Sequence, residues 1–299
     1  MALVSILAQA QATDLTLLAT VKRELGLTVS ADDPFLSDLI TQASSAITDY
    51  CRRTFGRQQI SEGIISMGKE TIMVSQPPIV ALGIITYRGD AVPSDDPGFP
   101  TYFVSDVNAG LIYNRFGWIS TAVMGWPSIF SVELSYMPEQ PNPTLYAVPY
   151  TGGWLMPGDD IADNQGISFD GTADAINLAS GIFPLLVPGD LITVFGSPHN
   201  SAQFSVVSAT PSQVLVSTPL TTEVAGPSIG IAVRNLPSSL ERAAIETVKG
   251  WYFSRDRDWA TKMERIGTPR AGGWTAQYEP DDAFSSQTIR LLTKYVLDV

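Results

Sequence analysis

Cysteine and histidine are almost absent from this chain of 299 residues, which contains one of each, Cys51 and His199. A single cysteine excludes an intramolecular disulfide framework and any zinc site that needs several cysteines. A single histidine excludes His-rich metal sites and leaves a Ser-His-Asp triad with only one possible base. The segment around His199 supplies no nucleophile with an orienting acid, so we expect His199 in a surface loop. Cys51 falls on the apolar side of a predicted helix, where we expect it to be packed and inert.

Charged residues are also scarce, at 16% of the chain against about 25% in an ordinary globular domain. No apolar run approaches the roughly 18–20 residues that span a bilayer, so we expect no membrane partner. Residues 1–12 are apolar but lack a basic start, which favours an N-terminal arm or helix start over a signal peptide. We expect such an arm to pack on something, for example a neighbouring chain.

Basic charge is missing from the middle of the chain. Between Arg115 and Arg234, 118 residues contain nine acids and no Lys or Arg, and the whole chain has a net charge of -12. Because contacts to phosphates need Lys or Arg, this middle is not a nucleic-acid-binding surface of the usual kind. Basic residues cluster in the predicted helical ends, where they fit either solvated faces with ordinary ion pairs or contacts with a polyanion or an acidic protein. The candidates for such an interface are Arg52, Arg53, Arg57, Arg255 and Arg257.

Motifs of common enzyme classes are missing as well, because the chain has no P-loop, no G-x-S-x-G and no G-x-G-x-x-G pattern. Residues 158–164 offer oxygens that suit calcium, but they lack the spaced acidic pattern of an EF-hand, which favours a plain acidic loop. The six Trp residues could form a sugar-binding platform, although core or subunit-interface packing is the commoner use of Trp. We therefore expect no enzyme activity, no catalytic or cofactor-binding residue, no cofactor and no metal.

Apolar periodicity predicts helices at both ends of the chain. A first helix is expected from a cap at Thr13 or Asp14 to Leu25, and a second from Asp33 to a stop at Gly56, each with one apolar face. Towards the other terminus, a Leu-Pro-Ser-Ser segment starts a helix whose apolar face lies over 240–252. Ser285 or Ser286 can cap a last helix.

Short β-branched or aromatic segments, separated by turn residues, predict strands in the remainder. They fill residues 58–155, whereas 154–181 lacks a regular pattern and is expected to be a hinge or loop. A second β block then follows, with strands at 191–195, 203–207, 214–217 and 229–233. The expected fold class is therefore α+β, with a helical bundle from the N- and C-terminal helices, a central β-sheet region, and a small β-barrel or sandwich.

Five segments in a fixed order carry a family resemblance. They read SQPPIVALGIITYRGD, TYFVSDVNAGLIYNRFGW, SVELSYMPE, VPYTGGW and NLPSSLERAAIETVKGWYFSRD. With the YCRR segment that ends the N-terminal helical pair, this order resembles the head–tail connector (adaptor, or head-completion) family of tailed bacteriophages. The resemblance covers roughly 14–155 and 234–299, and family members run straight from the Tyr-Thr-x-Gly strand to the Leu-Pro helix. It implies a helical adaptor core of 1–57 plus 234–299, an adaptor β region of 58–155, and an inserted β module of 156–233.

The resemblance implies a non-enzymatic structural protein of the virion neck, assembled in the host cytoplasm. Such adaptors form a ring, typically dodecameric, beneath the portal protein, extend the DNA channel, and give a platform for the next neck or tail protein. The implied partners are the portal protein, that neck or tail protein, and copies of the chain itself, while packaged DNA passes without sequence-specific binding. The C-terminal segment of such adaptors docks on the portal, which points to Tyr295, Val296 and Leu297. The alternatives are another neck or tail structural component, or a carbohydrate-binding β module that uses the Trp residues.

Overall fold

The computed structural model describes residues 3–65, 69–87, 89–92, 101–115, 117–118, 145–162, 165–254, 263–266, 274–277 and 284–296. Its contacts divide the chain into two compact units, each built from segments far apart in the sequence. The helical unit consists of Ala12–Arg53, Met156–Gly158 and Arg234–Val299, and the β unit of Met1–Gln11, Thr54–Leu155 and Asp159–Val233. The finer division into three segments stays a prediction.

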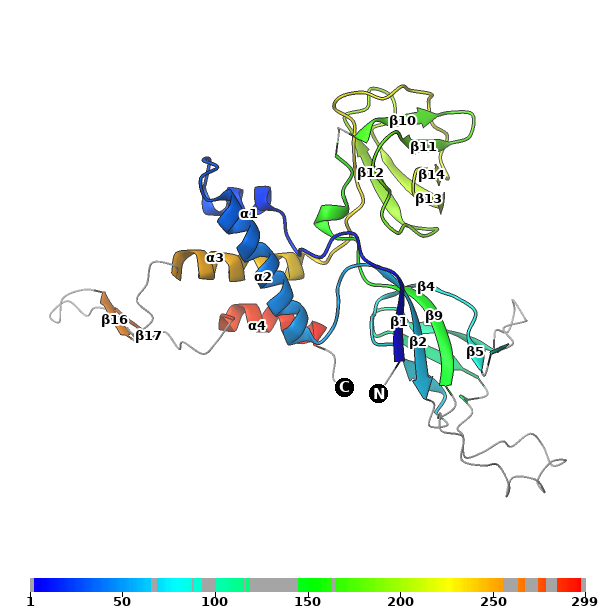
Figure 1. Cartoon of the computed structure of the whole chain (residues 1–299), viewed down its shortest axis with the longest axis horizontal. Helices are drawn as coiled ribbons and strands as arrows, with labels where there is room; N and C mark the ends of the chain where they lie inside the picture. Colours follow the sequence, from blue (N-terminus) through cyan, green and yellow to red (C-terminus); the bar gives the residue numbers. More distant parts are fainter. Residues whose placement is uncertain are drawn as a thin grey trace, which may run out of the picture. The chain divides into compact units, whose positions relative to one another are not determined.

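The described part of the helical unit contains helices from both ends of the chain (Figure 1). They are α1 (Leu18–Leu25), α2 (Asp33–Cys51), α3 (Ser238–Ser254), α4 (Ser286–Leu292) and the short 3-10 helix η4 (Thr293–Tyr295). Helix α3 packs against α1, α2 and α4. Apolar residues spaced three and four apart give α1, α2 and α3 a shared core. Its buried members are Val21, Leu36, Leu39, Ile40, Ala43, Ile245, Val248 and Tyr252.

Polar contacts fix the ends of these helices. The Tyr252 hydroxyl donates to the Asp32 carboxylate at 2.7 Å, and Lys22 pairs with Asp33 at 2.6 Å, so both contacts hold the start of α2. Ser285 is the N-cap of α4, as the sequence predicted, and its hydroxyl accepts a hydrogen bond from a backbone N–H in the first turn. Such a cap satisfies one of the backbone donors that a helix start leaves unpaired.

The first part of the β unit contains two antiparallel sheets around one apolar core. The larger sheet has the order β1 (Leu3–Ala8), β2 (Gln58–Ile65), β9 (Leu145–Gly152), β5 (Thr86–Tyr87) and β6 (Asp90–Ala91), and β4 (Ile79–Leu82) also pairs with β9. The smaller sheet has the order β3 (Thr71–Met73), β8 (Leu111–Asn114) and β7 (Tyr102–Asp106). Inward-facing residues of both sheets form the core, with Ile60, Ile112, Val148 and Tyr150 among its most buried members.

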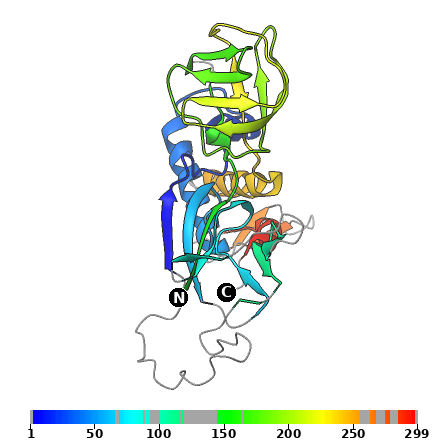
Figure 2. The ribbon, with the colours of Figure 1, turned by 90° about the vertical axis from the view of Figure 1, so that its right-hand side faces the viewer.

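The second part of the β unit is a six-stranded antiparallel sheet that curves into a half-barrel (Figure 2). Its order is β10 (Ile167–Asp170), β11 (Ala175–Leu178), β14 (Gln213–Val216), β13 (Gln203–Ala209), β12 (Leu191–Phe195) and β15 (Gly230–Ala232). Along β12, buried and exposed residues alternate, as expected for a strand with one face on a core. The 3-10 helix η2 (Pro157–Asp159) precedes this sheet. A separate hairpin pairs β16 (Met263–Ile266) with β17 (Trp274–Gln277).

The mixed helix-and-strand class is confirmed, and the helical bundle and the closed barrel or sandwich stay predictions. Two local expectations were wrong. The N-terminal segment is strand β1 rather than an arm or helix start, because its backbone pairs with antiparallel β2. The stretch 154–181 is not a plain loop, since β10 and β11 form a hairpin there around a polar turn. Both are four-residue strands, too short to give a clear periodic pattern.

Candidate functional site

The predicted portal-docking residues lie at the end of the helical unit. Tyr295 is only 9% exposed, and its hydroxyl lies 2.7 Å from the Ser239 hydroxyl at the start of α3. Val296 is partly buried, and Leu297 lies outside the described residues. Tyr295 therefore ties η4 to α3, while the portal-docking role of the three residues stays a prediction.

The predicted basic interface residues occupy different environments. Arg52 is exposed and ends α2 in a left-handed conformation with φ of 54°. Arg53, one residue further on, is buried. Arg255 and Arg257 lie outside the described residues. Arg52 thus offers its charge to solvent at the end of α2, whereas Arg53 is packed, and an interface role for this set stays a prediction.

Arg57 takes part in a buried ion pair inside the β unit. Its guanidinium donates to the Asp190 carboxylate at 2.5 Å, and the two side chains are 2% and 8% exposed. It also donates to the Leu185 carbonyl at 3.3 Å, and Asp190 accepts a further bond from the Val187 backbone N–H at 2.8 Å. The pair therefore joins the start of β2 to the turn before β12. Sequence reasoning identified the arginine as a candidate but gave no signal that it meets Asp190.

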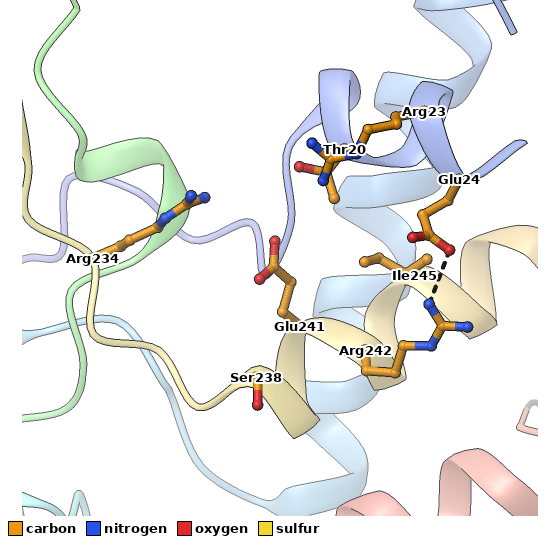
Figure 3. A pocket seen from close by; sticks show the side chains of 8 residues that line it. All are labelled: Thr20, Arg23, Glu24, Arg234, Ser238, Glu241, Arg242 and Ile245. Atoms are coloured by element: carbon orange, nitrogen blue, oxygen red, sulfur yellow. Dashed lines mark hydrogen bonds and ion pairs between the residues drawn. The ribbon is translucent and has the colours of Figure 1, made fainter. Parts of the chain in front are cut away.

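A polar groove lies in the helical unit, between α1 and the start of α3 (Figure 3). It has a volume of about 280 Å³ and is lined by Thr20, Arg23, Glu24, Arg234, Ser238, Glu241, Arg242 and Ile245. Arg242 donates to Glu24 at 2.9 Å across it, and Arg234 and Glu241 both point into it. Guanidinium and carboxylate groups side by side suit contacts with a polar protein surface that carries charges of both signs.

The groups with a clearly shifted pKa are buried and structural. Burial raises the pKa of Cys51 from 9.0 to about 11, and the positive charge of Arg53 opposes that rise. Burial also raises the pKa of Tyr150, and the nearby Glu62 carboxylate adds to the effect. The Tyr150 hydroxyl donates to Glu62 at 3.0 Å, and the same carboxylate accepts from the backbone and side chain of Ser75. Both shifted groups therefore stay protonated at neutral pH and serve packing.

The acidic segment 158–164 was considered above as a calcium loop. One of its carboxylates forms a hydrogen bond with the backbone of the same chain. Asp160 accepts from the Val233 backbone N–H at 2.8 Å, and Asp159 is buried. Asp163 and Asn164 lie outside the described residues. Within the described ranges, His, Cys, Asp and Glu nowhere gather in groups of three or more that could hold a metal ion.

The loop that carries His199 is held by a hydrogen-bond network. Ser197 donates to Glu223 at 2.6 Å and accepts from the Asn200 backbone N–H at 2.7 Å. The Asn200 amide donates to Glu223 and to the Thr221 carbonyl, and its oxygen accepts from the Thr221 backbone N–H. The network fixes the turn between β12 and β13 against the segment after β14, which is a structural use of these residues.

Of the tryptophans whose side chains the structure describes, Trp118 is buried, whereas Trp154 and Trp251 are partly buried. Trp118 is 1% exposed and lies edge-on to Tyr146, with ring centroids 5.1 Å apart. Trp154 packs against Phe55 at 5.9 Å, and Trp251 packs against the core of the helical unit. A sugar platform needs accessible rings, which Trp118 does not offer, and the carbohydrate-binding alternative stays a prediction.

Comparison with known proteins places the N-terminal part of the chain in a family. No curated protein gives a significant match. In the part of the chain that the structure describes, no helix combines the length and apolar character that crossing a membrane requires. Residues 16–77, which contain α1, α2, β2 and β3, match the model of the family described as phage gp6-like head-tail connector protein. The resemblance drawn from the sequence motifs is thereby confirmed for residues 16–77, which are similar to this connector family.

Proposed function

We propose that this protein is a head–tail adaptor of a tailed phage, a structural component of the virion neck. The observation that carries the proposal is the connector-family match over residues 16–77. That segment spans α1 and α2, whose apolar faces share a core with α3. The matched helices therefore share their core with a helix near the other end of the chain.

In this proposal, copies of the chain form a ring beneath the portal protein, and twelve copies is the expected number. The ring extends the DNA channel and presents a platform to the next neck or tail protein. A ring of identical subunits uses heterologous contacts, in which one patch meets a different patch on the neighbour. The net charge of -12 supports a channel that repels phosphate rather than one that holds DNA.

The proposed role is non-catalytic. The shifted pKa values belong to buried groups with structural contacts, and in the groove of the helical unit Arg242 pairs with Glu24. Such a surface suits protein–protein contact better than bond cleavage. A second neck or tail component stays the alternative within the same family assignment, and position in the particle separates the two.

Particles from a phage that lacks this gene product test the proposal. We expect DNA-filled heads without attached tails, and we expect tails to be restored when the full chain is supplied. A supplied chain that carries Arg57→Ala should restore fewer tails, because loss of the buried ion-pair partner destabilises the β unit. Normal tailed particles in the absence of the protein would contradict the proposed role.

A further inference from the structure

The half-barrel has a core of its own inside the β unit. The buried members of that core all lie within residues 155–233, and Ile192 and Ile231 are among the most buried. The buried members of the core between the two preceding sheets all lie within residues 60–150. No buried residue described in one of these cores belongs to the other. Because a packed core of its own is what allows a domain to fold, each segment has the means to fold as a unit.

The backbone of the half-barrel is equally self-contained. Among the described strands, β10 to β15 pair only with one another. The chain enters and leaves this sheet at one place, because Ile161 and Ile231 exchange backbone hydrogen bonds of 2.8 and 3.0 Å. Asp160 also accepts a hydrogen bond from the Val233 backbone N–H at 2.8 Å. Adjoining ends are typical of a domain inserted into another, since the host needs only a short gap to accept it.

Polar contacts and a cavity mark the junction between the half-barrel and the first part of the β unit. Arg57 donates to Asp190 and to the Leu185 carbonyl, and Gln11 donates to the Phe183 carbonyl at 3.1 Å. Residues of both parts line a cavity of about 210 Å³ beside these contacts. Side chains that face a cavity lose the close contacts that hold a core together. The junction is therefore packed less tightly than either core.

We infer that residues 160–233 are a separate cooperative module, which unfolds and refolds without opening the sheets of the first part. The Arg57–Asp190 pair then ties a complete module to the start of β2. Cooperative units of this kind open with a free energy of their own. The connector match at residues 16–77 includes no strand of the module, so the module is an addition to the matched segment. This holds whether or not the chain acts as an adaptor.

Two matched core variants of the full chain test the module. Ile192 of β12 and Ile112 of β8 are both fully buried, one in each core. Ile192→Ala and Ile112→Ala remove the same atoms, and the cavity that each leaves destabilises the unit that contains it. Ile192→Val and Ile112→Val are milder versions, for use where an Ala variant does not fold. Amide hydrogen exchange followed by mass spectrometry measures how often each strand opens.

We expect Ile192→Ala to speed amide exchange by at least about tenfold in β10 to β15 and to leave β2, β8 and β9 unchanged. Ile112→Ala should do the reverse, because the cavity then lies in the other core. Faster exchange in both sets of strands from either variant would show that the β unit opens as a whole. That result would overturn the separate module.

Tryptophan fluorescence gives a second measurement on the same variants. Residues 155–233 contain no Trp, so the fluorescence change during urea unfolding comes from Trp residues outside the module. We expect Ile192→Ala to leave the urea midpoint of that change unaltered, while circular dichroism detects an earlier loss of strand structure. A fluorescence midpoint that falls as far with Ile192→Ala as with Ile112→Ala would contradict the inference.

Discussion

At the scale of single residues, the ion pair of Arg57 and Asp190 is the most buried charge contact described in the β unit. The partners are 133 positions apart in sequence, so they join segments that the chain itself keeps distant. A buried pair is costly to desolvate, and removal of one partner leaves the other charge uncompensated. The pair therefore makes the packing of β2 and the turn before β12 mutually dependent.

Arg57→Ala is expected to destabilise the β unit by about 3–5 kcal/mol, because it leaves Asp190 buried without its partner. The matched control is Arg242→Ala, which removes exposed ion pairs with Glu24 and Glu246 at a side chain that is 44% exposed and should cost about 0–1 kcal/mol. Urea unfolding followed by tryptophan fluorescence measures both. Equal losses of unfolding free energy in the two variants would show that the buried pair stabilises the protein no more than an exposed one.

Cys51 provides a probe of the helical unit because it is the one cysteine of the chain. Its side chain is 0% exposed, and a pKa of about 11 leaves roughly a hundredfold less thiolate at pH 8 than an ordinary thiol has. We expect Ellman's reagent to react with the folded protein at least a hundredfold more slowly than with protein in urea. Rapid labelling of the folded protein would mean that α2 is not packed as described.

The same shift predicts the direction of a pH effect. The folded pKa of Cys51 lies above its ordinary value of 9.0, so its contribution to stability is complete below pH 9 and is lost as the pH rises towards 11. The raised pKa of Tyr150 acts in the same direction at still higher pH. Unfolding free energy should therefore fall from about pH 9 upwards, and Cys51→Ala should remove the first part of that fall.

At the scale of elements, tight turns decide how the strands of the half-barrel connect. Gly196 follows β12 with φ of +75°, and a Cβ there would lie 1.9 Å from the Ser228 carbonyl oxygen. Gly189, before β12, has φ of +93° but open space around it. Both positions need a left-handed backbone, and only Gly196 also needs the close approach of another segment.

Gly196→Ala should therefore destabilise the β unit more than Gly189→Ala. Gly189→Ala is expected to cost about 1–2 kcal/mol from backbone conformation alone, and Gly196→Ala adds the clash with Ser228. Thermal or urea unfolding of the two variants measures the difference. A smaller loss of unfolding free energy for Gly196→Ala than for Gly189→Ala would show that the backbone at Ser228 shifts at little cost to relieve the clash.

Elements with a clear pattern were predictable from the sequence. Residues 191–195 form β12 with the predicted bounds, and Ser285 caps α4. The buried face of α2 follows the expected spacing as well. Short strands such as β10 were not predictable, because four residues give no reliable period. The pairing of β1 also escaped prediction, because an apolar segment does not reveal which strand it joins.

The candidate site was less predictable than the elements, for a physical reason. Charge and polarity in the sequence identified Arg57, but burial and its contact with Asp190 depend on tertiary packing across 133 positions. The groove of the helical unit likewise combines residues of α1 with residues more than two hundred positions later. Local patterns report faces and caps, whereas such contacts arise only once the chain has folded.

At the scale of the whole molecule, the account concerns assembly. Acids outnumber bases by 30 to 18, which opposes association between copies and with DNA. Contacts between copies in the proposed ring must therefore offset this repulsion. The connector match at residues 16–77 is the reason to expect copies to associate, as the ring of the proposed neck.

The most direct test is a density map of the intact neck of a particle that contains this protein. The account predicts a closed ring of copies directly beneath the portal, with the helical unit and the β unit of each copy recognisable. Density for the protein at another place in the virion, or its absence from purified virions, would contradict the central claim.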